Sequence, residues 1–565
     1  MATGMATAAI SLSRAAVRWS IVAAGWANVA SAQVTAPLPG QEAPPRQEQM
    51  PPGTQSPDGS PAGTQRPGTR PGPQEPQARA EAPPRERAWK ITPDLKLGMT
   101  YSDNLTLAPA AAALSGWVTD ITPGIRVEGR SARLRGYFDY RLHNLYYANR
   151  PGLDNRRNLL SSLLTLEAVE KRFFIDARAS ISQLNRSAFG ATPTDVTSAM
   201  PNRVETSVYQ VSPYVRGRIS DIALYQVRFN ATYGSTSGAS SGNSTSSQWV
   251  ASVRNASPSV KLGWQLEGST LSAQSSATGT SETARARAGL IYQARPELHF
   301  TVFEGIETIN VPGSARRSAQ TPGAGVAWNP GPRTQVAVIR EKRFFGTAQN
   351  LQISHRTPLM AFRYSEDKDA VVLPLVIAAA GPGSLHALMS DLQASSIPDP
   401  IQRAQAVNVQ LARAGLQAET SAVGGFDSSR MLLRHNRQAS AVMVGRRNTL
   451  TLTWTRVNLQ ALGALSGAAD SFSLSPSIRQ EGLSFAWASR LSALSSLTVQ
   501  ASRLHSAGAT AGGPDSTQSR QSVQLSHQLG PRTAVSLGAR QSQFDSTVAN
   551  GYREKAILAA LSMRF

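Results

Sequence analysis

The chain has 565 residues, no cysteine and a formal net charge of +21, with 57 Lys and Arg against 36 Asp and Glu. The lack of cysteine excludes a disulfide scaffold and cysteine-based metal sites. The basic residues are scattered along the chain without a basic helix or an aromatic RNA-binding signature, so no nucleic acid is expected as a partner, and anionic lipid or polysaccharide fits better.

Residues 1–32 have the features of a secretory signal peptide. A positive region (Arg14, Arg18) precedes a short apolar core, and residues 30–32 (Ala-Ser-Ala) form a small-residue cleavage site. The apolar core is shorter than the roughly 20 residues that span a bilayer, so it predicts export and not an anchor. No later stretch reaches 18 apolar residues, which argues against helical membrane spans.

Residues 33–88 predict a disordered periplasmic tether. This segment holds 14 of the 35 prolines among Gln, Gly, Arg and Glu, a composition that cannot build a core. As a flexible chain it would reach on the order of 40 Å. It is interpreted either as a spacer or as a segment that binds peptidoglycan or a periplasmic partner.

Residues 89–565 show apolar and polar side chains in alternation, as expected for strands with one apolar and one hydrophilic face. Clear examples are 173–182, 225–233 and 448–454. Short turns, including the sequence Gly-Pro-Arg-Thr at 331–334 and again at 530–533, alternate with longer polar loops such as 185–202. This asymmetry predicts an all-β fold, a transmembrane antiparallel β-barrel of about 22 strands (20–24) with both ends on the periplasmic side.

One segment, at about 367–430, breaks the strand pattern. It is rich in Ala, Leu and Gln, and Leu385, Leu388, Met389 and Leu392 recur at helical spacing. Asp399 before Pro400 is a candidate start for another helix. The insertion follows an upward strand, so it is expected outside the cell or inside the lumen, as a packed surface loop or as a plug or lid.

The last ten residues, 556–565, predict a strand that closes the barrel. One face of this strand ends in a terminal aromatic residue, a signature by which outer-membrane barrels are recognised for assembly. That face comprises Ile557, Ala559, Leu561, Met563 and Phe565.

No catalytic, metal or cofactor site is predicted. Residues 238–242 match the pattern G-x-S-x-G, but they lie in a Ser/Gly loop without the strand-to-helix elbow that a nucleophile needs. The seven histidines never pair at metal-ligand spacing, and no Gly-rich phosphate loop is present.

Arginines on the hydrophilic strand faces are expected to point into the lumen, because a charge facing lipid near mid-membrane costs about 2–4 kcal/mol. They are interpreted either as partners of lumenal acids or as an anion-attracting lining. The candidates are Arg133, Arg135, Arg141, Arg178, Arg228, Arg285, Arg287, Arg520 and Arg540.

Several stretches resemble the PEP-CTERM-system-associated outer-membrane β-barrel family of exopolysaccharide-producing Gram-negative bacteria. They are "WKITPDLKLGMTYSDNLTLAP", "WVTDITPGIRVEGRSARLRGYFDYRLHNLYY", "RFFIDARASISQ" and "GRRNTLTLTWTR". The resemblance runs from about residue 90 to the end and carries no catalytic residues. It implies a role in the export or surface display of polysaccharide, or of proteins sorted alongside it.

Three functions are therefore carried forward: a non-enzymatic channel or export component, a structural or assembly protein with a closed lumen, and an outer-membrane hydrolase. The expected partners are outer-membrane lipids, the barrel assembly machinery, and anionic polysaccharide or periplasmic export components. No cofactor is expected.

Overall fold

The computed structural model describes residues 89–565 except 194, 238–241, 258–260, 373–383, 395, 398–402, 404, 405, 409, 412–420, 464–469 and 511. The predicted signal peptide and tether, most of the G-x-S-x-G match and the Asp399-Pro400 helix start lie outside these residues.

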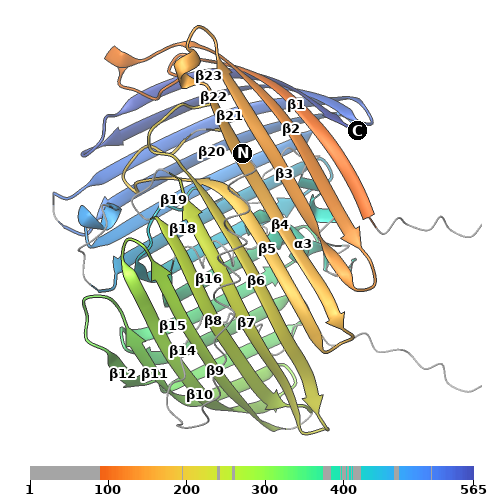
Figure 1. Cartoon of the computed structure of the whole chain (residues 1–565). Helices are drawn as coiled ribbons and strands as arrows, with labels where there is room; N and C mark the ends of the chain where they lie inside the picture. Colours follow the sequence, from red (N-terminus) through yellow and green to blue (C-terminus); the bar gives the residue numbers. More distant parts are fainter. Residues whose placement is uncertain are drawn as a thin grey trace, which may run out of the picture.

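The described residues form one closed antiparallel sheet (Figure 1). Its strands are β1 (Trp89–Ser102), β2 (Gly116–Arg130), β3 (Leu134–Tyr147), β4 (Asn155–Val169), β5 (Phe173–Leu184), β6 (Val204–Ile219), β7 (Ala223–Thr236), β8 (Asn243–Asn255), β9 (Leu262–Ser275), β10 (Gly279–Arg295), β11 (Leu298–Asn310), β12 (Arg317–Gln320), β13 (Gly323–Gly331), β14 (Thr334–Arg343), β15 (Gly346–Arg356), β16 (Met360–Val372), β17 (Met431–Val444), β18 (Asn448–Ala461), β19 (Ser477–Arg490), β20 (Ser495–Gly508), β21 (Asp515–Gly530), β22 (Thr533–Ser546) and β23 (Tyr552–Arg564). Each strand pairs with its neighbours in sequence, and β1 pairs with β23 to close the ring.

The predicted number of strands is confirmed. β12 and β13 both pair with β11, at its far and near ends respectively, so the two segments form one interrupted strand. The 23 segments therefore occupy 22 positions in a transmembrane β-barrel. The sequence of β12 and β13 is interrupted at Thr321 and Pro322, and Pro322 cannot donate a backbone hydrogen bond to the ladder.

Alternation of side chains gives the wall an apolar outside. In β1 and β2 the exposed side chains Ile91, Leu97, Met99, Trp117 and Ile121 share the outer face. Residues of the opposite parity are polar or small and face the lumen, as expected for a barrel that spans a membrane. The C-terminal residues Ile557 and Phe565 also lie on the outside, where 64% and 63% of their surface is exposed.

The two ends of the barrel differ as the sequence predicts. At the end where the chain enters β1 and leaves β23, the turns have two to six residues, and both Gly-Pro-Arg-Thr sequences lie there. The opposite end carries the long connections, with the three short 3-10 helices η1 (Ala110–Ala112), η2 (Pro151–Leu153) and η3 (Ser471–Ser473). By analogy with bacterial outer-membrane barrels, the short-turn end is periplasmic and the long-loop end faces outward.

The insertion begins later than predicted. Residues 367–372 continue β16, because they pair with β17 up to Val372 opposite Met431. The connection between these strands therefore spans 373–430 and contains α3 (Ser384–Gln393), which includes the four predicted apolar residues. Among the described residues no helix is long and apolar enough to cross a membrane.

Closure through the β1–β23 seam can be tested with cysteines, because the native chain has none. We expect Met99→Cys with Ala559→Cys, which are direct partners across the seam, to form a disulfide under mild oxidation. The product should migrate anomalously on a denaturing, non-reducing gel. Met99→Cys with Leu537→Cys is the control, since β23 lies between these two positions and disulfide formation there would contradict the seam.

Candidate functional site: the filled lumen

The lumen wall from β9 to β17 carries a ladder of ion pairs. Arg285 and Arg287 of β10 both contact Glu341 of β14, and Arg287 also pairs with Glu267 of β9. Arg285 and Arg287 therefore serve as partners of carboxylates on the lumen wall.

The ladder continues toward the long-loop end through Arg343 of β14. Its guanidinium pairs with Glu307 of β11 and Asp369 of β16, and the Arg343 and Glu307 side chains are 5% and 0% exposed. Arg434 of β17 then pairs with Asp367 at 2.7 Å. Truncating one member would leave a buried charge without its partner, which typically costs 3–5 kcal/mol.

Helix α3 lies inside the barrel, against the inner faces of β16, β17 and β19. Leu385, Leu388 and Met389 are buried in one cluster with Val407 and Leu411 from the later part of the insertion. The wall residues of the cluster are Ala361 of β16, Val442 of β17, and Ala486 and Ala488 of β19. These wall residues lie close to the short-turn ends of their strands, so the helix sits deep in the lumen. We call these wall residues the helix seat.

Polar contacts hold α3 in register. Arg363 of β16 pairs with Asp391 at 2.6 Å, and Arg356 donates to the Asp391 carbonyl oxygen at 2.8 Å. Burial raises the pKa of the Asp391 carboxyl above its usual range, and Arg363 and Arg356 oppose this effect without cancelling it.

The apolar contacts outweigh the ion pair energetically. A fully buried Leu or Met contributes about 1.5–3 kcal/mol. The Arg363–Asp391 pair is more than a third exposed on its arginine side, and exposed pairs contribute roughly 0–1 kcal/mol.

The insertion returns to the long-loop end along the inner faces of β18 and β19. Ser421 donates to Thr455 of β18 at 3.0 Å, and a Cβ on Gly482 of β19 would meet Ala422 and Val423 at 2.9 Å. The lack of a side chain at Gly482 is therefore required by this close approach.

The connection between β5 and β6, residues 185–203, folds across the long-loop end of the lumen. Phe189 packs with Phe472 and Phe426, and Ala188 donates to Ser471 Oγ at 2.9 Å. Asp427 donates its backbone N–H to the carbonyl oxygen of Asn185 at 2.8 Å. The β5–β6 loop thus joins its own side of the barrel to the β18–β19 connection and to the end of the insertion.

A second set of contacts ties this loop to β22. Arg540 pairs with Asp195 of the loop and with Glu554 of β23, the latter at 2.8 Å. Burial acts to raise the pKa of Asp195, but Arg540 and hydrogen bonds from Thr197 outweigh it and hold the pKa below its usual range. We call the Arg540–Asp195 contact the loop latch.

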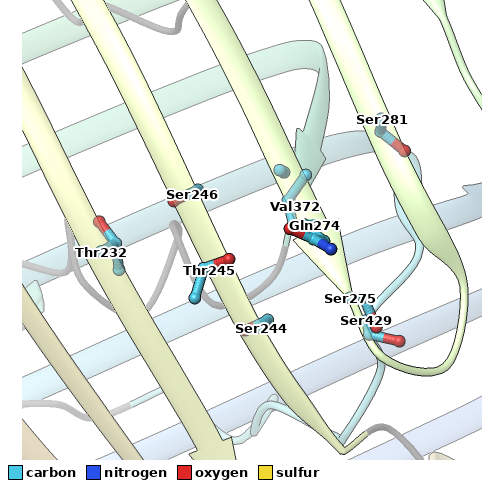
Figure 2. A pocket seen from close by; sticks show the side chains of 10 residues that line it. Thr232, Ser244, Thr245, Ser246, Gln274, Ser275, Ser281, Val372 and Ser429 are labelled. Atoms are coloured by element: carbon cyan, nitrogen blue, oxygen red, sulfur yellow. The ribbon is translucent and has the colours of Figure 1, made fainter. Parts of the chain in front are cut away.

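Contacts from the other side of the barrel also reach this end. Val372 and Met431 pack with Leu271 of β9 and Ile309 of β11, and Thr278 donates to the carbonyl oxygen of Ser429 at 3.3 Å. Figure 2 shows the small cavity beside them, where Val372 and Ser429 face a hydroxyl-rich surface of β7–β10. It is lined by Thr232, Ser244, Thr245, Ser246, Ala273, Gln274, Ser275, Ser281, Val372 and Ser429.

The structure places eight of the nine predicted lumenal arginines on inner faces of strands. These are Arg135, Arg141, Arg178, Arg228, Arg285, Arg287, Arg520 and Arg540. Arg133 was wrongly assigned to a strand, because it lies in the turn before β3 begins at Leu134. Five of them pair with acids across strands or in loops: Arg228 with Asp176 at 2.8 Å, Arg141 with Asp139 at 3.4 Å and Asp94 at 4.0 Å, and Arg285, Arg287 and Arg540 as described above.

The sequence analysis identified residues 185–202 as a long polar loop but did not predict that this loop folds across the lumen, and it missed the loop latch and the helix seat. Asp195 and Arg540 are separated by 345 positions, and only the folded barrel brings them together. Among the described residues no group of three or more His, Cys, Asp or Glu could hold a metal ion.

Comparison with known proteins assigns no family to this chain. No protein-family model and no curated protein matches this chain. Solved structures that align with it include the FrpB iron transporter from Neisseria meningitidis (F3-3 variant; 9% identity, TM-score 0.45, covering 85% of this chain and 82% of that one). Others are the siderophore receptor PirA from Pseudomonas aeruginosa (9%, 0.35, 84% and 80%) and OccAB4 from Acinetobacter baumannii (9%, 0.33, 86% and 100%).

The loop latch should depend on pH in one direction. Because the Asp195 pKa is lowered in the folded protein, the latch contributes stability above the usual carboxyl pKa, roughly 4, and loses it as pH falls through the lowered value. We expect Asp195→Asn to release the loop at neutral pH. The measurement is the reactivity of Ala188→Cys, a buried site, toward a thiol reagent that works in acid.

The Asp195→Asn protein should show high reactivity at every pH, and the protein with native Asp195 should show it only in acid. Asp545→Asn, on β22 near the same end, is the control and should leave the reactivity low at neutral pH. Equal reactivity with and without Asp195→Asn at neutral pH would show that the latch does not hold the loop.

Proposed function

We propose that this protein is a non-enzymatic, gated passage through the bacterial outer membrane, and that the described conformation is its closed state. The carrying observation is that helix α3 occupies the lumen against the helix seat. A barrel of 22 strands encloses a lumen too wide to be filled by its own wall side chains, and barrels of this size are typically plugged. Here a segment of the same chain, anchored at both ends in one strand pair, takes that place.

The nature of this filling supports a reversible gate. The helix seat is a small set of alanines and one valine, and α3 contributes three buried side chains to it. The gain from burying them, about 1.5–3 kcal/mol each, can be offset by a ligand or a partner that binds the undocked segment. The barrel wall itself stays intact when α3 leaves, because the ion pairs between the wall strands do not involve α3.

The cargo that we propose is an anionic polymer, exopolysaccharide above all, or proteins displayed with it. Two arguments support this. One is the resemblance of residues 90–565 to the exopolysaccharide-associated family, and the other is the pair of inner-face arginines on β3, Arg135 near the short-turn end and Arg141 midway along the strand. Arg141 forms ion pairs with Asp139 at 3.4 Å and with Asp94 at 4.0 Å. Its side chain is still 46% exposed, so it keeps access to solvent in the lumen.

A structural or assembly protein with a permanently closed lumen is the second candidate. The observation that favours it is the covering of the long-loop end by three connected segments, the β5–β6 loop, the β18–β19 connection and the end of the insertion. Conductance distinguishes the two candidates. No described contact favours the hydrolase.

The first test is single-channel conductance of the refolded chain in a planar bilayer, with and without residues 373–430. Val372 and Met431 are direct partners, so a short Gly-containing turn can join β16 to β17 without disturbing either strand. We expect little current from the full chain and a large current after deletion. No current from either protein, with barrel folding shown by heat-modifiable migration, would contradict the passage.

A point substitution tests the seat without deleting the segment. We expect Leu388→Asp to raise the open probability, because a carboxylate cannot be buried among the seat alanines without a partner. Ala387→Asp is the matched control, since Ala387 lies on the half-buried side of α3, outside the cluster. Equal effects of the two substitutions on the open probability would contradict a role of the helix seat in gating.

Ion preference tests the cargo proposal. In the channel opened by deletion of 373–430, Arg135→Glu with Arg141→Glu should shift the reversal potential in a salt gradient from anion toward cation preference, because two added carboxylates join Asp139 and Asp94. The control is Arg295→Glu, because Arg295 is the last residue of β10 and its side chain is 75% exposed. An unchanged reversal potential would contradict an anion-attracting lining at this position.

A further inference from the structure

The outer face of β14–β20 differs from that of β1–β3. On β1 to β3 the outward residues are apolar or uncharged along the full length of each strand. On β14–β20 the outward face starts apolar at the short-turn end, with residues such as Phe362, Leu452 and Phe485, and becomes charged from its middle upward. The charged outward residues are Arg340, Lys342, Glu366, Lys368, Arg437, Arg456, Arg479, Glu481 and Arg503.

Strand pairing fixes the direction of these side chains. Met360, which is exposed, lies opposite Met443, and the same ladder without a register shift places Glu366 opposite Arg437. Leu452 lies opposite Phe485, and the ladder then pairs Arg456 with Glu481. The charges therefore share the face of exposed apolar residues and point away from the lumen.

The two outward carboxylates are already neutralised within this face. Glu366 accepts from His435 at 2.7 Å and from Arg437 at 2.8 Å. Glu481 accepts from Arg456 at 2.7 Å and from the indole of Trp454 at 3.0 Å.

The remaining cations of this face have no such neutralisation. Lys368 lies over the ring of Phe345, 5.8 Å from its centroid. Arg340, Lys342, Arg479 and Arg503 pair with no carboxylate in the described part of the chain. Three of these are arginines, whose planar guanidinium suits phosphate oxygens. We call Arg340, Lys342, Arg479 and Arg503 the outward cations.

The outward cations lie at the height of the outer leaflet. Arg340 is six residues beyond Thr334, where β14 starts at the short-turn end, and Arg503 is eight residues beyond Ser495. At 3.3 Å per residue and a tilt near 40°, Arg340 and Arg503 lie about 15–20 Å above that end, in the upper part of a band about 25 Å tall. Arg479 is eleven residues from Arg490, the short-turn end of β19, and lies about 28 Å above it, at the height of the headgroups. The apolar band is therefore thinner on this side, and lipid headgroups must approach these side chains or leave them facing hydrocarbon.

We propose that the outward face of β14–β20 binds the phosphate groups of outer-leaflet glycolipids. The outward cations supply the charge, and the shortened apolar band draws the headgroups down to them. The proposal rests on the outer-membrane location in the proposed function and is independent of passage, so conductance and lipid binding can fail separately.

A second copy of the chain is a poorer occupant. A twofold dimer through this face would bring the same patch of both subunits together and set outward cations against outward cations. Like charges facing one another across an interface are unfavourable, while phosphate complements them. Charge complementarity therefore selects the lipid.

The test is native mass spectrometry of the full chain in detergent micelles, titrated with bis-phosphorylated lipid A. We expect defined lipid adducts that are lost when the lipid is dephosphorylated. Each cation near an anionic lipid contributes about a fivefold change in binding, so Arg340→Gln, Arg479→Gln and Arg503→Gln together should weaken it about a hundredfold.

The matched control removes the same charge at the other end of the barrel. Lys171 and Arg532 lie in exposed turns, and Arg295 is the exposed last residue of β10. Lys171→Gln, Arg295→Gln and Arg532→Gln together should leave the adducts unchanged. Heat-modifiable migration of both triple variants establishes that the barrels are folded. Equal weakening by the control, equal binding of dephosphorylated lipid A, or a dimer in place of lipid adducts would each overturn the proposal.

Discussion

The fold depends on one constraint: inside a membrane every backbone N–H and C=O needs a partner within the protein. The β1–β23 seam satisfies this requirement by leaving no sheet edge, with nine residue pairs from Asp94 opposite Arg564 to Ser102 opposite Ala556. Closure in turn divides side chains into two sets by parity. The outward side chains contact lipid and must be largely apolar. The inward side chains line the lumen, which is wide because the barrel has 22 strands.

How that space is occupied follows from the chemistry of the inner set. Where β9–β17 carry arginines and acids, the wall stabilises itself by ion pairs and offers little apolar surface. Near the short-turn end, β16, β17 and β19 carry three alanines and one valine on the inner face, and the apolar side of α3 packs against them. The helix therefore lies where the wall is least polar, and the polar loops close the opposite end, where water and hydroxyl groups are available.

Local patterns predicted the fold well because each depends on neighbouring residues. Alternation identified the strands, the repeated Gly-Pro-Arg-Thr sequence marked two turns, and helical spacing from Leu385 to Leu392 identified α3. Placement inside the lumen could not be predicted, since it depends on Ala361, Val442 and Ala486 meeting from three separate strands. The outward cations contradict the expectation that strand arginines face the lumen. In "VAVIREK", Arg340 is in phase with the apolar Val336 and Val338, and this was the available signal.

The direct pairing of Val372 with Met431 has a kinetic consequence. Both ends of the 58-residue connection leave the wall at one point, so the undocked helix remains tethered within reach of its seat. Because the helix and its seat belong to one chain, the effective concentration of the helix at the seat is on the order of millimolar. A soluble ligand that keeps the helix undocked must bind it more favourably than the seat does at this effective concentration. Once the ligand dissociates, the helix returns to the lumen in a unimolecular step. Such an arrangement resets itself without a second protein.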